Sequence, residues 1–166
     1  MITLGIDQSF ASTGYVVLED DDIVKYGIIT SNKNDNMYDR AFAVATELAK
    51  LCEKYKADKV VIEGIPFMSK SNVTRDLAGL QYVIVTSLWR YELGDTLYII
   101  PPTALKKFAT GIGRHPKVKG KNQKEPMFEA LPDEVKTVIS RVPKSKGRYD
   151  VCDAYWLAKF DTKETK

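Results

Sequence analysis

Residues that commonly bind transition metals or form disulfides are scarce in this sequence. It has one histidine, His115, and two cysteines, Cys52 and Cys152. A single histidine leaves too few ligands for a typical catalytic zinc site, and we expect His115 to be an exposed loop residue. Both cysteines fall on apolar faces of predicted helices, so we expect reduced core residues and no disulfide.

Long apolar runs and nucleophile motifs are missing as well. No stretch approaches the roughly 20 apolar residues of a membrane span, and the N-terminus enters a strand pattern without a basic-then-apolar signal segment. We therefore expect a cytoplasmic protein with no membrane part. No serine or cysteine lies in a nucleophile elbow, which argues against a catalytic triad.

Length and composition are those of one globular domain. The chain has 166 residues, 44% of them hydrophobic and 28% charged, enough for a single core over residues 1–166. Apolar patterns predict five strands, at 2–7, 14–18, 23–30, 59–63 and 96–100. Helical spacing predicts helices at 37–55, 73–93, 132–141 and 150–160, with a short helix after Thr103. Three antiparallel strands followed by two strand–helix crossovers predict an α/β fold, a five-stranded mixed sheet flanked by helices.

Four acidic residues are placed where chemistry is expected. Asp7 and Glu63 each end an apolar strand pattern, and Asp150 and Asp153 are three residues apart in a predicted helix, so the last two share one helix face. A carboxylate at a strand end is often solvated, and an aspartate at a helix start is often a cap. Converging carboxylates would instead suit Mg²⁺ or Mn²⁺, and an unpaired acid after a buried strand is costly.

The net charge of +3 conceals a segregation of charge. No acidic residue occurs from Thr96 to Lys124, and the part at 111–124 predicts a mobile basic loop. A second basic block ends just before Asp150. Such a rim would attract a polyanion. The basic residues expected to contact DNA are Lys107, Arg114, Lys117, Lys119, Lys124, Lys146 and Arg148.

These motifs resemble those of the RuvC family of Holliday-junction resolvases, and the element order resembles the ribonuclease H-like fold. Ile6-Asp7 with Ser12-Thr-Gly-Tyr15 is similar to the family's first motif, Val60-Val-Ile-Glu63 to its second, and Asp150-Val-Cys-Asp153 to its last. The resemblance implies that Asp7, Glu63, Asp150 and Asp153 bind two divalent ions, Mg²⁺ or Mn²⁺, in each active site.

The resemblance also implies roles outside the acids. Lys106 and Lys121 are expected to be catalytic lysines, and Phe67 to be the apolar wedge at the junction crossover. The alternative for Phe67 is packing in the core beneath its loop. Here Pro66 is inserted before Phe67 and the basic loop is longer, so the elements that select the substrate depart from the family pattern.

The sequence therefore predicts a metal-dependent endonuclease that cleaves branched DNA, chiefly four-way junctions, with relaxed structure specificity as an option. The alternatives are a ribonuclease acting on RNA–DNA hybrid, a non-cleaving branched-DNA-binding protein, and a small ATPase of the actin and sugar-kinase superfamily, for which the chain is too short. Two symmetric cuts suit a two-fold dimer, which we expect around residues 77–91, where apolar side chains occupy more than one helix face. We expect the protein to act in the cytoplasm of a bacterial cell or a phage-infected host.

Overall fold

A five-stranded mixed sheet forms the centre of the protein. The computed structural model describes residues 1–65, 72–91, 93, 96–114, 116 and 122–162. The strands are β1 (Ile2–Asp7), β2 (Thr13–Glu19), β3 (Asp22–Ile29), β4 (Lys59–Glu63) and β5 (Leu97–Ile100). They lie in the order β3-β2-β1-β4-β5. The pairs β1–β2 and β2–β3 are antiparallel, whereas β1–β4 and β4–β5 are parallel, which confirms the predicted sheet.

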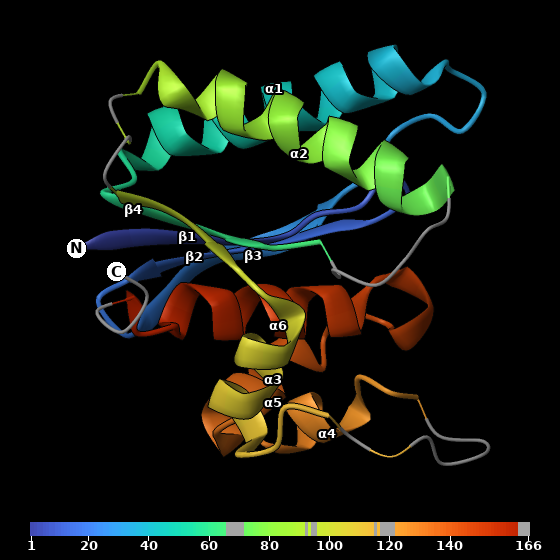
Figure 1. Cartoon of the computed structure of the whole chain (residues 1–166). Helices are drawn as coiled ribbons and strands as arrows, with labels where there is room; N and C mark the ends of the chain where they lie inside the picture. The colour runs from blue at the N-terminus through green and yellow to red at the C-terminus, as the bar shows by residue number, and fades with distance from the viewer. Residues whose placement is uncertain (66–71, 92, 94–95, 115, 117–121, 163–166) are drawn as a thin grey trace.

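Helices cover both faces of the sheet (Figure 1). The long helices α1 (Met37–Tyr55) and α2 (Asn72–Trp89) pack on one face, and α6 (Arg148–Lys159) lies across the other. The short helices α3 (Pro102–Thr110), α4 (Glu125–Glu129) and α5 (Asp133–Ile139) lie beyond α6, and the 3₁₀ turn η2 (Lys144–Lys146) leads into it. None of the helices in the described ranges is long and apolar enough to cross a membrane.

Successive side chains along each strand point to opposite faces of the sheet. Leu4, Ile6, Val60 and Ile62 belong to the core cluster beneath α1 and α2. The intervening Val61 belongs to the second cluster, beneath α6. The two strand-end acids are therefore directed toward α6.

Two glycines allow α6 to lie directly on the sheet. A Cβ atom at Gly5 would stand 2.1 Å from the carbonyl oxygen of Ala154, and one at Gly14 would stand 2.2 Å from that of Asp150. Any larger residue at either position would displace the helix backbone. The first turn of α6 thus lies against the start of β2, and its later turns lie against the middle of β1.

Some element boundaries differ from the prediction. The last helix begins at Arg148 instead of residue 150, because Gly147, with φ of +91°, supplies the left-handed turn that precedes it. Helix α4 was not predicted, since five residues after a basic run give little periodicity. Cys52 and Cys152 are buried and free, as predicted.

Candidate active site

The strand register brings the first two acids together. Ile6 pairs with Ile62 in the parallel ladder between β1 and β4, so Asp7 and Glu63 follow one step later on adjacent strands. Asp7 is buried and Glu63 is half-buried. Both side chains are on the side of the sheet that α6 covers, where the charge of Asp7 contributes to raising the pKa of Glu63.

Helix α6 brings the other two acids to the same place. Asp150 lies in its first turn and Asp153 in its second, so the two carboxylates share the face that packs on β1 and β2. Asp153 is almost completely buried, with a side chain only 4% exposed, whereas Asp150 is 24% exposed. The amino end of a helix also favours a negative charge in its first turn.

One ammonium group joins three of these carboxylates. The Lys124 Nζ atom lies 2.8 Å from Asp7 Oδ2, 2.9 Å from Asp150 Oδ1 and 2.8 Å from Asp153 Oδ2. Lys124 is the residue just before α4, and its own side chain is 34% exposed. The prediction gave this lysine only a role in DNA contact; the structure instead places its ammonium inside the acidic cluster.

Burial and mutual repulsion shift the protonation of the cluster. Burial raises the pKa of Asp153 to about 7, against the opposing ammonium of Lys124. Burial, followed by the charges of Asp7 and Asp153, raises the pKa of Glu63 well above its usual range. Burial also raises the pKa of Asp7. Burial lowers the pKa of Lys124, but the carboxylates outweigh it and the net shift is upward, so this lysine stays charged.

Polar neighbours position the acids from outside the cluster. Ser12 Oγ donates to Asp150 Oδ2 at 2.7 Å. Gln8 and Gln81 donate to the backbone carbonyl oxygen of Glu63 at 2.9 and 3.1 Å. These contacts hold β4 and the start of α6 at fixed positions relative to β1.

The donor set fits a divalent cation better than it fits a single ammonium. Four carboxyl groups face one positive charge, and the buried Asp153 Oδ1 has no hydrogen-bond partner among the described residues. Carboxylate oxygens are the ligands that Mg²⁺ and Mn²⁺ take. In the described part of the chain no three such groups stand in a metal-holding arrangement. Three of the four acids are instead arranged around Lys124.

The other predicted residues occupy several places. Lys106 is half-buried on α3, and the ion pairs of the cluster are made by Lys124 instead. Lys107, Arg114 and Lys146 are exposed, as a DNA contact requires. Arg148 donates to the backbone carbonyl oxygens of residues 142 and 140 at 2.7 and 2.9 Å, so its guanidinium stabilises the segment that precedes α6. The predicted residues outside the described part of the chain are Phe67, His115, Lys117, Lys119 and Lys121.

Sequence reasoning missed the central position of Lys124 and the contact of Ser12 with Asp150. The sequence did contain a signal for the position of Lys124. Pro126 favours the first turn of a helix, which marks Lys124 as the residue where the basic loop ends and the chain becomes fixed. No signal in the sequence pairs Ser12 with an acid 138 residues away.

Comparisons with known proteins point to one family. A family model described as crossover junction endodeoxyribonuclease RuvC matches residues 3–141. A RuvC of Brachyspira hyodysenteriae is 32% identical over 117 residues, which cover 68% of this chain and 72% of that protein. A RuvC of Caldicellulosiruptor saccharolyticus is 28% identical over 163 residues, covering 95% of this chain and 90% of that protein. The second alignment is long enough to include almost the whole chain.

Solved structures share the fold. RuvC of Thermus thermophilus in complex with a Holliday junction substrate has a TM-score of 0.71 at 14% identity, covering 95% of this chain and 90% of that one. The yeast mitochondrial Holliday junction resolvase Ydc2 has a TM-score of 0.62 at 16% identity, covering 94% of this chain and 75% of that one. The predicted ribonuclease H-like fold is thereby confirmed.

Proposed function

Because this chain belongs to the crossover junction endodeoxyribonuclease RuvC family, we propose that it is an endonuclease that cleaves branched DNA and resolves four-way junctions. The observation that carries the proposal is the convergence of three buried or half-buried carboxylates from β1 and α6 on one ammonium, with Glu63 beside them. Such a cluster has a high electrostatic cost in the free protein. A cost of this kind is typical of a functional site.

The family consists of metal-dependent nucleases, and the residues fit a divalent cation. The cation would be held by Asp7, Glu63, Asp150 and Asp153. We propose Mg²⁺ or Mn²⁺ as the ion, with two ions in each site. The ions would lower the pKa of an attacking water and stabilise the leaving oxygen of the phosphodiester.

Lys124 gives the free site a counter-charge. Its ammonium stands among the carboxylates that would bind the cation, so it has to withdraw when a cation binds. Lys124 is the last residue of the basic stretch that begins after Thr96. After withdrawal its ammonium is available to a DNA phosphate, together with the exposed Lys107 and Arg114. Lys106 and Lys121 keep their predicted catalytic role as part of this proposal, as does the wedge role of Phe67.

A homodimer through α2 is the second part of the proposal. Leu80, Ile84 and Leu88 of this helix are fully buried in the core of the subunit. Tyr82 and Trp89 remain 76% and 59% exposed, and their spacing of seven residues places them on one face, two turns apart. Exposed aromatic side chains of this kind are typical of an interface. Two such subunits related by a two-fold axis would present two sites for two symmetric cuts.

Cleavage of labelled DNA tests the proposal. Four-way junction, replication fork, linear duplex and RNA–DNA hybrid are incubated with Mg²⁺ or with EDTA, using wild type and Asp7→Asn. We expect cleavage of the junction that requires both the metal and Asp7. Binding of the junction without cleavage in any metal would make the protein a binding module, and cleavage of the hybrid alone would make it a ribonuclease. Localisation in the cytoplasm of a bacterial cell or a phage-infected host stays a prediction.

A further inference from the structure

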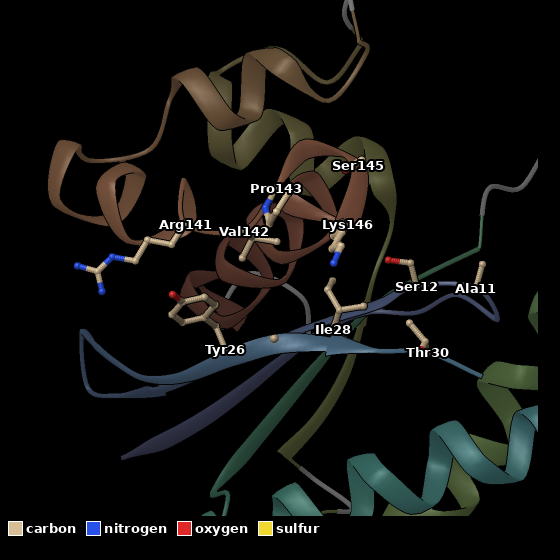
Figure 2. Close-up of a pocket in the computed structure, with 12 residues that line it drawn as sticks. Ala11, Ser12, Tyr26, Ile28, Thr30, Arg141, Val142, Pro143, Ser145 and Lys146 are labelled. Atoms are coloured by element: carbon tan, nitrogen blue, oxygen red, sulfur yellow. The ribbon is translucent and has the colours of Figure 1, made fainter. Parts of the chain in front are cut away.

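A cavity lies beside the acidic cluster, on the far side of Ser12. It has a volume of about 610 Å³, is open to solvent on one side, and lies between β3 and the segment from Arg141 to Gly147. Figure 2 shows Tyr26, Ile28 and Thr30 rising from the strand, opposite Val142, Pro143 and the η2 turn. The volume is within the range of sites that hold one small ligand.

The cavity adjoins the proposed catalytic site through Ser12. Ser12 lines it, and the hydroxyl of the same serine donates to Asp150 at 2.7 Å. Gly147 lines it too, and a Cβ atom there would stand 2.7 Å from Ser12 Oγ and 2.6 Å from Ile28 Cδ1. A ligand in this cavity would therefore be a direct neighbour of whatever occupies the acidic cluster.

The basic side chains of this region differ in what they already contact. Lys144 pairs with Glu125 at 3.7 Å, and Arg148 is bonded to two backbone carbonyl oxygens. No acidic partner for Arg141 or Lys146 is recorded within the described ranges. In Figure 2 the Lys146 side chain points into the cavity, above Ile28 and next to Ser12, whereas Arg141 extends away from it. Lys146 is thus a positive charge inside a cavity that contains no negative one.

The walls combine the surfaces that a nucleotide needs. The Tyr26 ring is half-buried on β3, with its hydroxyl 3.4 Å from the carbonyl oxygen of Val138, and Val142 and Pro143 form the opposite wall of the cavity. Aromatic and apolar faces of this kind stack on any base without reading its sequence. The hydroxyl groups of Ser12, Thr30 and Ser145 add hydrogen-bonding groups around the rim.

We propose that this cavity binds one unpaired nucleotide of the DNA strand that crosses the acidic cluster. The phosphate contacts Lys146, and the base lies between Tyr26 and Pro143. The inference rests on the proposed function. The cavity volume of about 610 Å³ suits a single nucleotide, which must leave the base stack to enter it. Leaving the stack costs least where pairing is already interrupted, which gives this side of the site a preference for branch points over intact duplex.

Crosslinking locates the nucleotide. Single 5-iodouracil residues are placed at each position around the cut site of a four-way junction, and irradiated complexes in EDTA are analysed by peptide mass spectrometry. We expect a crosslink to Tyr26 from a nucleotide adjacent to the cut phosphate. A junction that is bound and cut, but whose nucleotides crosslink only elsewhere, would overturn the inference and leave the proposed function intact. A chain that binds no branched DNA would remove both.

Two variants test the cavity independently of the crosslink. Ser145→Trp fills it from an exposed position, and Lys146→Met removes its charge. We expect each to lose the Tyr26 crosslink and to bind the junction about tenfold more weakly, with a melting temperature close to that of wild type. Thr137→Trp, which adds the same bulk on the exposed side of α5, should retain both properties. The proposal would be contradicted if Ser145→Trp and Thr137→Trp bound the junction with equal affinity. It would also be contradicted if deoxythymidine monophosphate bound in the cavity but the junction gave no crosslink to Tyr26.

Discussion

The ammonium of Lys124 and the carboxylate of Asp7 are separated by 117 residues in the sequence and by 2.8 Å in the structure. This ion pair joins the end of the basic loop to the end of the first strand. Asp7 is only 8% exposed, so removal of its partner would leave a buried and uncompensated charge. The same contact occupies an oxygen atom of Asp7 that would bind the divalent cation in the proposed function.

Replacing Lys124 distinguishes its contribution to stability from its competition with a cation. We expect Lys124→Met to bind Mn²⁺ at least about tenfold more tightly than wild type, because the cation no longer competes with an internal ammonium. In EDTA the variant should melt at a lower temperature, since breaking a buried ion pair costs about 3–5 kcal/mol. Calorimetric titration with Mn²⁺ and thermal melting measure both effects.

The matched control is Lys107→Met, which removes the same charge from an exposed position on α3. It should leave the Mn²⁺ affinity within about twofold of wild type, because exposed charges are screened. Equal effects of the two substitutions would show that Lys124 acts only through its long-range charge and does not occupy the metal position.

The stability of the metal-free protein depends on pH through Asp153. Its pKa is raised by burial to about 7, from 3.8, so the folded state binds a proton more tightly than the unfolded state does. The stabilisation from this proton is complete below about pH 4 and is lost as the pH rises to about 7. In EDTA, the melting temperature of wild type should therefore fall relative to that of Asp153→Asn between these values. A constant difference across that range would contradict the pKa shift.

The contact between Gly14 and α6 controls both stability and the site. In Gly14→Ala the new Cβ atom would stand 2.2 Å from the carbonyl oxygen of Asp150, so the first turn of α6 must move. We expect a loss of about 1–3 kcal/mol in the free energy of unfolding and slower junction cleavage, measured by denaturant unfolding and single-turnover kinetics.

Gly79→Ala is the corresponding control. Apart from its chain neighbours and the helix's own backbone, no atom of the described residues lies within 4 Å of the position its Cβ would take, and it is an exposed residue inside α2. The substitution should stabilise the protein by up to about 1 kcal/mol, because alanine favours a helix over glycine. Unaltered stability and cleavage in Gly14→Ala would show that α6 does not need this close approach.

The proposed dimer depends on the exposed aromatic residues of α2. Tyr82→Glu combined with Trp89→Glu should give monomers by light scattering, since two charges would be buried in the interface. Tyr38→Glu is the control, because Tyr38 is 79% exposed on α1. Dimers that persist in the double variant, or monomers in wild type at the concentrations used for cleavage, would move the interface elsewhere or remove it.

The sequence predicted the sheet because each strand carries its own signal. Uninterrupted apolar runs mark β1 and β4, and the acid that ends each of them is visible without any knowledge of the fold. The spacing of Asp150 and Asp153 likewise needs only the helix period. Local pattern, with the rules for strand connections, was therefore sufficient for the number and relative directions of the strands and for the four candidate acids.

Contacts between distant segments could not be predicted in this way. The position of Lys124 depends on how the chain packs against the acidic cluster after the basic loop, and no local sequence pattern predicts that packing. The cavity beside Ser12 requires the η2 turn to stand over β3, a relationship fixed by the packing of Ile28 against Gly147. Both features are tertiary, and both concern the contacts that surround the acids.

The measurement that tests the central claim most directly is the effect of a divalent cation on thermal unfolding. A cation that binds only the folded state at about 100 times its dissociation constant adds about 2.7 kcal/mol of stability. For a domain of this size we expect millimolar Mn²⁺ to raise the melting temperature of wild type by about 5–10 °C, and to have no effect on Asp7→Asn. An unchanged melting temperature in wild type, or an equal increase in Asp7→Asn, would contradict the assignment of the acidic cluster as the metal site.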